Sequence, residues 1–266
     1  PVPDGYTRFV TTPRELAPGE EILVNEWLAL PADDDRDVID VRGEDSPYLH
    51  HFILYSTSQS EPVGTHRAWQ DSDQVTLGLH LAGGFGSEAA GAYKPPAGVV
   101  FRVAKGRSLL ANVHYINTSS GTVVGRAWVD VKLAPPSPDK QVAGMFVSVD
   151  PTISLAPHAK SIVDVTCTMQ HDIGLFAWAN HMHELGTSTY AEVLRAGGGQ
   201  VDLRRDDAWD GEWAFNPRFA SWPTDAPMML HAGDTGHTRC VWNNPGAEAV
   251  TFPHEKCLGL GFFMGD

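Results

Sequence analysis

The 266-residue chain has few cysteines, few cationic residues and no long hydrophobic run. No apolar stretch approaches the roughly 18 residues that a membrane-spanning helix needs, so we expect no transmembrane anchor. Nineteen lysines and arginines stand against 33 aspartates and glutamates, which gives a formal charge of −14. Nucleic acids and anionic membranes repel such a surface, and we expect neither as a partner. No signal or transit sequence opens the chain, whose start at Pro1 is expected to be a mature or trimmed end.

The local signatures of several enzyme classes are also missing. There is no GxSxG nucleophile elbow. GGFG at 83–86 lacks the lysine and the strand-to-helix context of a phosphate-binding loop, and we interpret it as an ordinary loop. DDDRD at 33–37 lacks the glycine and the terminal glutamate of an EF-hand, so we interpret it as a solvated surface turn.

The three cysteines, Cys167, Cys240 and Cys257, contain no CxxC pair, so they cannot form a four-cysteine zinc site. Cys240 and Cys257 flank a short hairpin-like stretch. A bridge between them would close a loop of about 17 residues and constrain the unfolded chain by roughly 3 kcal/mol. Three unpaired thiols are the alternative. With this bridge Cys167 would have no cysteine partner. The bridge would also predict an oxidising, extracytoplasmic location, so that the protein is either secreted or periplasmic.

Alternation of apolar and polar residues predicts strands along almost the whole chain. In TVVGRAWVDVKLA, residues 122–134, one face carries Arg126, Asp130 and Lys132, and the other carries five apolar residues: Val123, Ala127, Val129, Val131 and Leu133. Residues 99–117 predict two strands around a turn, and 189–205 predict a hairpin with a glycine tip. No segment shows a 3.6-residue apolar stripe of helix length. Many prolines and glycines suit short strands joined by turns, so we predict an all-β fold with one or, preferably, two sandwiches.

The best candidate linker is LAPPSPDK, residues 133–140, with three prolines and a polar tail. A division there gives an N-terminal β-sandwich over residues 1–136 and a C-terminal β-sandwich over residues 137–266. Both have close to the commonest domain size. The two halves are generally similar in being rich in strands, and the sequence predicts no internal repeat beyond that similarity.

Five of the twelve histidines are spaced like metal ligands. His181 and His183 are two residues apart on an expected strand, so their imidazoles point to the same face. His50 and His51 are neighbours, and one metal can take both only at a bulge, or through Nδ1 of one and Nε2 of the other. His114 lies in an apolar strand, where a lone histidine is usually a satisfied core residue. As a third member it completes a set that suits copper or zinc.

With these motifs in this order, the chain resembles the copper type II, ascorbate-dependent monooxygenases, the family of peptidylglycine α-hydroxylating monooxygenase and dopamine β-monooxygenase. The resemblance covers most of the chain. It consists of HHFILYS at 50–56, KPPAGVVFRV at 94–103, LLANVHYIN at 109–117, QVAGMFVSVD at 141–150, FAWANHMHELG at 176–186, TRCVWNN at 238–244 and HEKCLGLGFFM at 254–264. The specific feature is the combination of a paired HH, a distant VHY and an HxH followed by Leu-Gly.

The resemblance implies two tandem jelly-roll-like antiparallel β-sandwich domains, each with one mononuclear copper site. By position, His50, His51 and His114 match the site of the first domain, which stores and relays electrons in the family. His181 and His183 match the second-domain site, at which dioxygen is activated and a substrate C–H bond is hydroxylated. The resemblance also implies ascorbate or another electron donor, dioxygen and a small organic substrate as partners.

At one ligand position the chain departs from the family pattern. Lys256 precedes Cys257, whereas the family has there a methionine ligand of the second copper. A cation opposes Cu(I) binding, and loss of the soft thioether weakens the reduced state. His254 and Met264 are alternative third ligands; otherwise the second site binds copper weakly or stays empty. The resemblance also implies the disulfide between Cys240 and Cys257.

The substrate positions differ as well. Ala179, Leu258 and Leu260 stand where peptide-amidating members carry the arginine, asparagine and tyrosine that anchor a peptide carboxylate. These replacements remove the charge-assisted hydrogen bonds that recognise a carboxylate, so we expect no amidation of glycine-extended peptides. A more apolar or aromatic small substrate fits these side chains better.

Two hypotheses on function follow. The first is a copper-dependent monooxygenase that hydroxylates a C–H bond with dioxygen and an external reductant. The alternative is a non-hydroxylating copper-binding or electron-transfer protein that has lost the methionine ligand of the oxygen-activating site. A cupin-like metal enzyme is a third reading, but its later glutamate is missing at the required spacing, because Glu184 is adjacent to His183 and Glu192 is too far along the chain.

Overall fold

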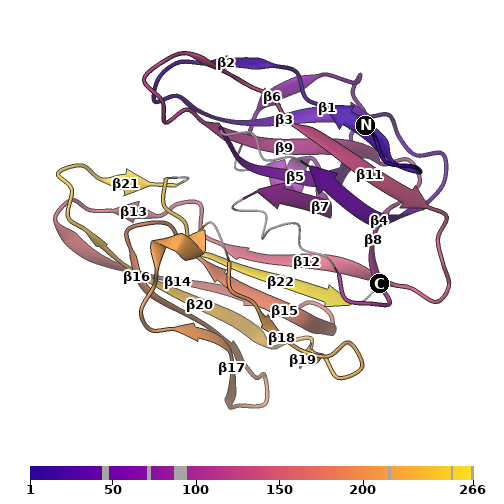
Figure 1. Cartoon of the computed structure of the whole chain (residues 1–266). Coiled ribbons are helices and arrows are strands. Elements are labelled where there is room, and N and C mark those ends of the chain that lie inside the picture. Colours follow the sequence, from indigo (N-terminus) through magenta and orange to yellow (C-terminus); the bar gives the residue numbers. More distant parts are fainter. Residues whose placement is uncertain (44–47, 71–72, 87–94, 215–216, 253, 265–266) are drawn as a thin grey trace. The chain divides into compact units, whose positions relative to one another are not determined.

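The computed structural model describes residues 1–43, 48–70, 73–86, 95–214, 217–252 and 254–264 (Figure 1). Strands dominate, so the predicted all-β fold class is confirmed. The helical elements in this described part are the short α1 (Asp73–Thr76) and the 3-10 turn η1 (Gly211–Ala214). No helix among them is long and apolar enough to cross a membrane. The chain divides into two compact units, Pro1–Ala143 and Gly144–Asp266.

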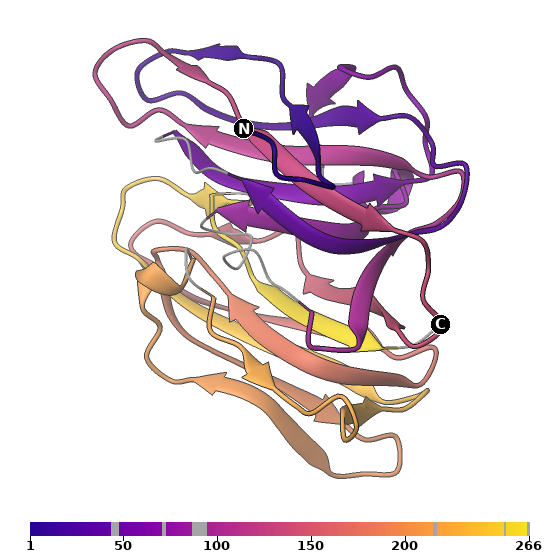
Figure 2. The same cartoon turned by 45° about the vertical axis from the view of Figure 1, so that its right-hand side comes forward.

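The first unit contains two main sheets and a short strand pair. Its strands are β1 (Thr7–Val10), β2 (Arg14–Leu16), β3 (Glu21–Ala29), β4 (Arg36–Gly43), β5 (Leu49–Thr57), β6 (His66–Ala68), β7 (His80–Gly86), β8 (Val99–Val103), β9 (Ser108–Ile116), β10 (Val123–Gly125), β11 (Trp128–Ala134) and the start of β12 (Gln141–Val149). One sheet has the order β6-β3-β9-β5-β7. A second has β1-β11-β4-β8 and continues where the start of β12 pairs in parallel with β8. β10 pairs with β2. Figures 1 and 2 show the two main sheets as stacked layers.

The second unit is built in the same way. Its strands are the rest of β12, then β13 (Ser154–Leu155), β14 (Ala159–Thr168), β15 (Ile173–His181), β16 (Gly186–Leu194), β17 (Gln200–Asp206), β18 (Ala220–Ser221), β19 (Met228–Leu230), β20 (Thr235–Asn244), β21 (Val250–Thr251) and β22 (Leu258–Met264). One sheet has the order β14-β20-β16-β17. The other has β12-β22-β15-β18, with β19 also on β15, and β13 pairs with β21. A buried cluster around Trp178, Leu175 and Val193 packs this unit.

The structure corrects two expectations about local structure. GGFG lies within β7, paired with β5, and is not a loop. A Cβ at Gly83 would collide with the side chain of Val41, so glycine permits a close approach between strands here. Residues 122–134 form two strands because β10 pairs with β2 whereas β11 pairs with β1 and β4, so the chain changes sheet between them.

The sheet β3-β9-β5 is repeated in register by β14-β20-β16. The pair Glu21–Ile116, between β3 and β9, corresponds to the pair Lys160–Asn243, between β14 and β20. Two residues further along, the pair Leu23–His114 corresponds to Ile162–Val241. Both sheets also share a bulge at the same place, between Leu49 and His51 on β5 and between Gly186 and Ser188 on β16. The two units therefore contain an internal structural duplication.

The duplication extends to the loops that close these sheets. Asn117 and Asn244 each donate from Nδ2 to the Leu and Ala carbonyls of a Leu-Ala-Pro segment, residues 16–18 and 155–157, at 2.9–3.2 Å. His158 follows the second segment with a φ of 50°, at the position where the first repeat has a glycine. The sequence alone predicts no such repeat, because few other residues are identical at corresponding positions.

Candidate functional site

The three histidines of the first unit converge at one point. His51 on β5 pairs directly with His114 on β9, and the register shift between Leu49 and His51 makes His50 the additional residue of a bulge. The His50 and His114 ring centroids are 4.7 Å apart, and those of His51 and His114 are 5.2 Å apart. Possible ligand atoms of all three lie within 4.8 Å of one another. The bulge is one of the two arrangements by which the sequence allows one metal to take both neighbours.

Hydrogen bonds determine which ring nitrogens face the cluster. Nε2 of His114 lies 2.7 Å from Oε1 of Glu21, and because a carboxylate accepts, the ring donates. Nε2 of His51 lies 2.9 Å from Oδ1 of Asn112. The Nδ1 atom of each of the three histidines is buried and makes no hydrogen bond. Three imidazoles with possible ligand atoms within 4.8 Å of one another fit a copper or zinc ion, and their buried Nδ1 atoms are the candidate ligand atoms.

The histidine pair of the second unit lies at the end of a strand. β15 ends at His181, so His183 lies beyond the strand rather than within it as expected. The two ring centroids are nevertheless 5.2 Å apart. Nδ1 of His183 donates to the carbonyl of His254 at 2.9 Å, which leaves Nε2 as the nitrogen able to bind a metal. Nδ1 of His181 is buried and makes no hydrogen bond.

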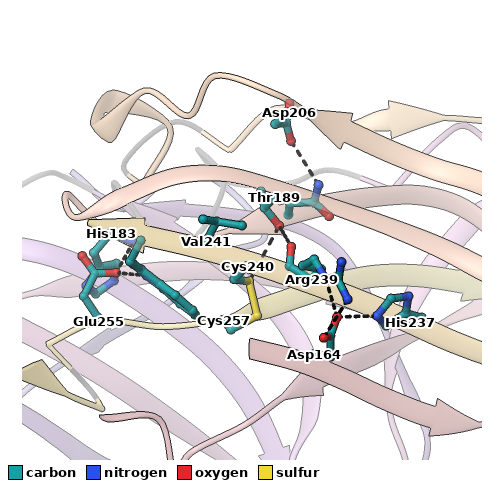
Figure 3. Close-up of a disulfide and its surroundings, with 12 residues drawn as sticks. Asp164, His183, Thr189, Asp206, His237, Arg239, Cys240, Val241, Glu255 and Cys257 are labelled. Carbon is teal, nitrogen blue, oxygen red and sulfur yellow. Dashed lines mark hydrogen bonds and ion pairs between the residues drawn. A yellow bond between two sulfur atoms is a disulfide. The ribbon is translucent and has the colours of Figure 1, made fainter. Parts of the chain in front are cut away.

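A buried carboxylate holds the segment that carries His183. Glu255 is 1% exposed and accepts from the backbone N of His183 at 3.1 Å, the backbone N of Leu185 at 2.7 Å and Nε1 of Trp242 at 2.9 Å. Figure 3 shows this carboxylate beside His183. These bonds fix the backbone around His183 to the segment that precedes Cys257.

The alternative third ligands are not placed to complete this pair. Among the residues that the structure describes, no further histidine, cysteine or carboxylate joins His181 and His183 in a three-ligand cluster. The His254 side chain is exposed. His181 pairs with Leu258 and Gly174 pairs with Met264, so Met264 lies six residues along β22, about 20 Å away. Two imidazoles without a third ligand are an incomplete site for Cu(I).

Apolar side chains lie next to His181 on its own sheet. Leu258 pairs with His181, Leu260 with Ala179, and Phe262 with Ala177. Because side chains two apart on a strand share a face, this row lies on the face opposite to Trp178, which packs in the core. The positions that bind a carboxylate in the resembled family therefore form an apolar row beside the histidine.

The predicted disulfide is confirmed. Cys240 and Cys257 are bridged, both are fully buried, and their Cα atoms are 5.8 Å apart (Figure 3). Cys167 is a free thiol. The bridge attaches β20 to the residue that follows Lys256.

Sequence reasoning missed the polar residues around the histidines. Asn112 lies two residues before His114 on the same strand face, a spacing that places its amide beside the ring of His51. Glu21 was not singled out, because its contact with His114 depends on pairing between β3 and β9. Asn25, which is fully buried, gives the one available signal, because it is a polar residue within an apolar segment; Asp73 lies in a polar segment and gives none.

Sequence comparison shows that the chain is similar to monooxygenases. No family model matches the chain. Over 93% of its length the chain is similar to peptidyl-glycine alpha-amidating monooxygenases A and B of Xenopus laevis, with 23% identity over 256 residues and 24% over 260. It spans 26% and 28% of their lengths, about a quarter of each. The major capsid protein P2 of bacteriophage PM2 matches with a TM-score of 0.37 and 10% identity over 98% of this chain and 97% of that one, which is too distant to support an argument.

Proposed function

We propose that the chain is a copper-dependent monooxygenase-like protein that hydroxylates a C–H bond of a small organic substrate with dioxygen and an external reductant such as ascorbate. The observation that carries the proposal is the convergence of His50, His51 and His114, whose ligand atoms lie within 4.8 Å of one another. The similarity to monooxygenases over 93% of the chain supports it.

In this proposal the residues of the first unit hold the metal in a fixed geometry. Copper bound there would supply one-electron redox chemistry. Glu21 and Asn112 accept hydrogen bonds from Nε2 of His114 and His51, which orients both rings and directs Nδ1 toward the cluster. Oriented ligands keep the donor set unchanged when the charge of the metal changes, as electron storage requires.

The substrate belongs next to the histidine pair of the second unit. Leu258, Leu260 and Phe262 form an apolar row beside His181, and Ala179 offers no charge to a carboxylate. An apolar substrate loses little on desolvation there, whereas a peptide carboxylate would be left without a partner. We therefore propose an apolar small molecule as substrate. The disulfide supports an extracytoplasmic location, because such bonds persist in oxidising compartments.

A second candidate function has its own supporting observation. Lys256 occupies the place of a soft ligand, and neither His254 nor Met264 is positioned to replace it. A chain with only the first centre would bind copper and transfer electrons without hydroxylating a substrate.

Copper stoichiometry and oxygen uptake distinguish the two functions. For the monooxygenase we expect two equivalents of Cu(I) per chain. We also expect ascorbate-driven oxygen uptake that increases when an apolar substrate is added and becomes hydroxylated. One equivalent without uptake would favour electron transfer. In His114→Ala one equivalent should be lost, because two imidazoles hold copper less tightly than three. A His114→Ala protein with unchanged copper content and electron paramagnetic resonance spectrum would show that these histidines are not the site.

A further inference from the structure

A row of buried polar side chains leads away from the three-histidine cluster. It runs from His51 to Asn112, Asn25, Asp73 and Arg67. The contacts are His51 Nε2 with Asn112 Oδ1 at 2.9 Å, Asn112 Nδ2 with Asn25 Oδ1 at 3.0 Å, Asn25 Nδ2 with Asp73 Oδ2 at 2.7 Å, and Arg67 Nη2 with Asp73 Oδ1 at 2.6 Å. His51, Asn112, Asn25 and Asp73 are all less than 5% exposed.

The carboxylate of Asp73 determines which group donates and which accepts in every hydrogen bond of this row. A carboxylate can only accept, so Asn25 must present its NH₂ group to Asp73 and its carbonyl oxygen to Asn112. Asn112 then donates through its own NH₂ group and turns its carbonyl oxygen to His51. Nε2 of His51 must carry the proton, which leaves the lone pair on Nδ1.

We propose that Asp73 is a positioning residue that acts through Asn25 and Asn112 to hold His51 as the Nε2–H tautomer, with Nδ1 ready to bind a metal. The copper part of this inference rests on the proposed function. A neutral asparagine pair alone is ambiguous, because either amide can turn around and reverse the row. An ionised group at one end removes that ambiguity.

The groups around Asp73 are hydrogen-bond donors. Its carboxylate accepts from Arg67, from Asn25 and from the backbone N of Gln70 at 2.9 Å. Arg67 lies on β6, directly across from Asn25, and its side chain is 40% exposed. The arginine and two further donors therefore surround the buried carboxylate, and Asp73 is the acceptor in each of these three hydrogen bonds.

The internal duplication shows that the fold itself does not need this row. The sheet positions of Asn25 and Asn112 are taken in the second unit by Asp164 and Arg239, which form an ion pair at 2.6 Å. The position of His51 is taken there by Ser188. The neutral amide row therefore occurs in the sheet that carries the three-histidine cluster. Its counterpart has Ser188 and Val241 at the positions of His51 and His114, and it uses a charged pair.

The tautomer of His51 in the metal-free protein tests the inference directly. With ¹⁵N-labelled histidine, two-bond ¹H–¹⁵N correlation spectra distinguish the Nε2–H from the Nδ1–H form, and the His51 signals are identified by their loss in His51→Ala. We expect a single Nε2–H form. An Nδ1–H form would overturn the inference. This measurement uses no metal, so failure of the copper proposal leaves its outcome valid.

The Asp73→Asn variant tests the role of the charge, and Asp37→Asn is its matched control. Asp37 is also buried in the first unit, pairs with Arg102 at 2.6 Å and accepts a backbone N at 3.0 Å, and it belongs to a different sheet. In Asp73→Asn we expect a mixture of His51 tautomers and a roughly 10- to 100-fold lower Cu(I) affinity by chelator competition. Equal losses in both variants, or an unchanged tautomer in Asp73→Asn, would refute the positioning role.

Discussion

At the scale of single residues, Lys256 separates the two candidate functions. It is 9% exposed and precedes the disulfide cysteine Cys257. Lys256→Met removes a positive charge and adds a thioether, a soft ligand that suits Cu(I). If the unmodified chain lacks a third ligand at its second site, as the electron-transfer function requires, we expect the variant to raise copper content from about one toward two equivalents per chain. It should also bind carbon monoxide, a probe of reduced copper, more tightly.

A matched control for this prediction is Lys160→Met, which removes an exposed lysine of the same unit. It should leave the copper content and the carbon monoxide signal unchanged. A strong carbon monoxide complex at His181 and His183 in the unmodified protein would contradict the prediction, because it would mean that the coordination is already complete.

At the scale of elements, His237 joins three strands of the second unit. Its Nδ1 lies 2.8 Å from Glu192 on β16, and its Nε2 lies 2.7 Å from Asp164 on β14 (Figure 3 shows the latter). Burial alone would lower the pKa of His237, but the hydrogen bonds to Glu192 and Asp164 outweigh burial and raise this pKa above its ordinary value. Arg239 lowers the pKa of Asp164 through its own hydrogen bonds, so that carboxylate stays ionised beside the imidazolium.

A raised pKa in the folded state gives this element a defined pH dependence. The stabilisation by protonated His237 is fully present below the unfolded pKa of about 6.5 and is lost as pH rises through the higher folded pKa. We expect the urea concentration at the unfolding midpoint of the second unit to decrease as the pH is raised from 6 to 9. His237→Gln should remove most of that decrease. The control is His171→Gln, at an exposed histidine. An equal pH dependence in wild type and His237→Gln would contradict the assignment.

The elements also show what sequence reasoning reaches. Strands such as β9 and β16 are predictable because their residue patterns are local. The division of residues 122–134 is not, because it depends on which strands β10 and β11 pair with. The histidines are recognisable by spacing, whereas the row from Asn112 to Asp73 joins β9, β3 and α1 and exists only after the sheet has formed.

At the scale of the whole molecule, the duplicated sheets have taken different roles. The sheet β3-β9-β5 carries three histidines on one face, and its counterpart β14-β20-β16 carries the ion pair of Asp164 and Arg239 there. The second histidine pair lies instead at the end of β15, in the other sheet of its unit. The two candidate centres are therefore not copies of one ancestral site, and duplication of the fold does not imply duplication of the metal ligands.

The disulfide makes the two units unequal in their response to reduction. Cys240 joins Cys257 within the second unit, and the first unit has no cysteine. Loss of a native bridge of this kind costs about 2–5 kcal/mol. We therefore expect the double variant Cys240→Ala/Cys257→Ala to lower the unfolding midpoint of the second unit in calorimetry and to leave that of the first unchanged. Copper bound by His50, His51 and His114 should persist.

Thiol counting provides the control for this prediction. The denatured, unreduced protein should titrate one free thiol per chain, from Cys167, and the double variant should titrate the same number. Three thiols in the unreduced protein would show that no bridge forms, and the argument for an oxidising compartment would fail with it. Loss of the first-unit copper in the double variant would show instead that the stability of the three-histidine centre depends on the second unit.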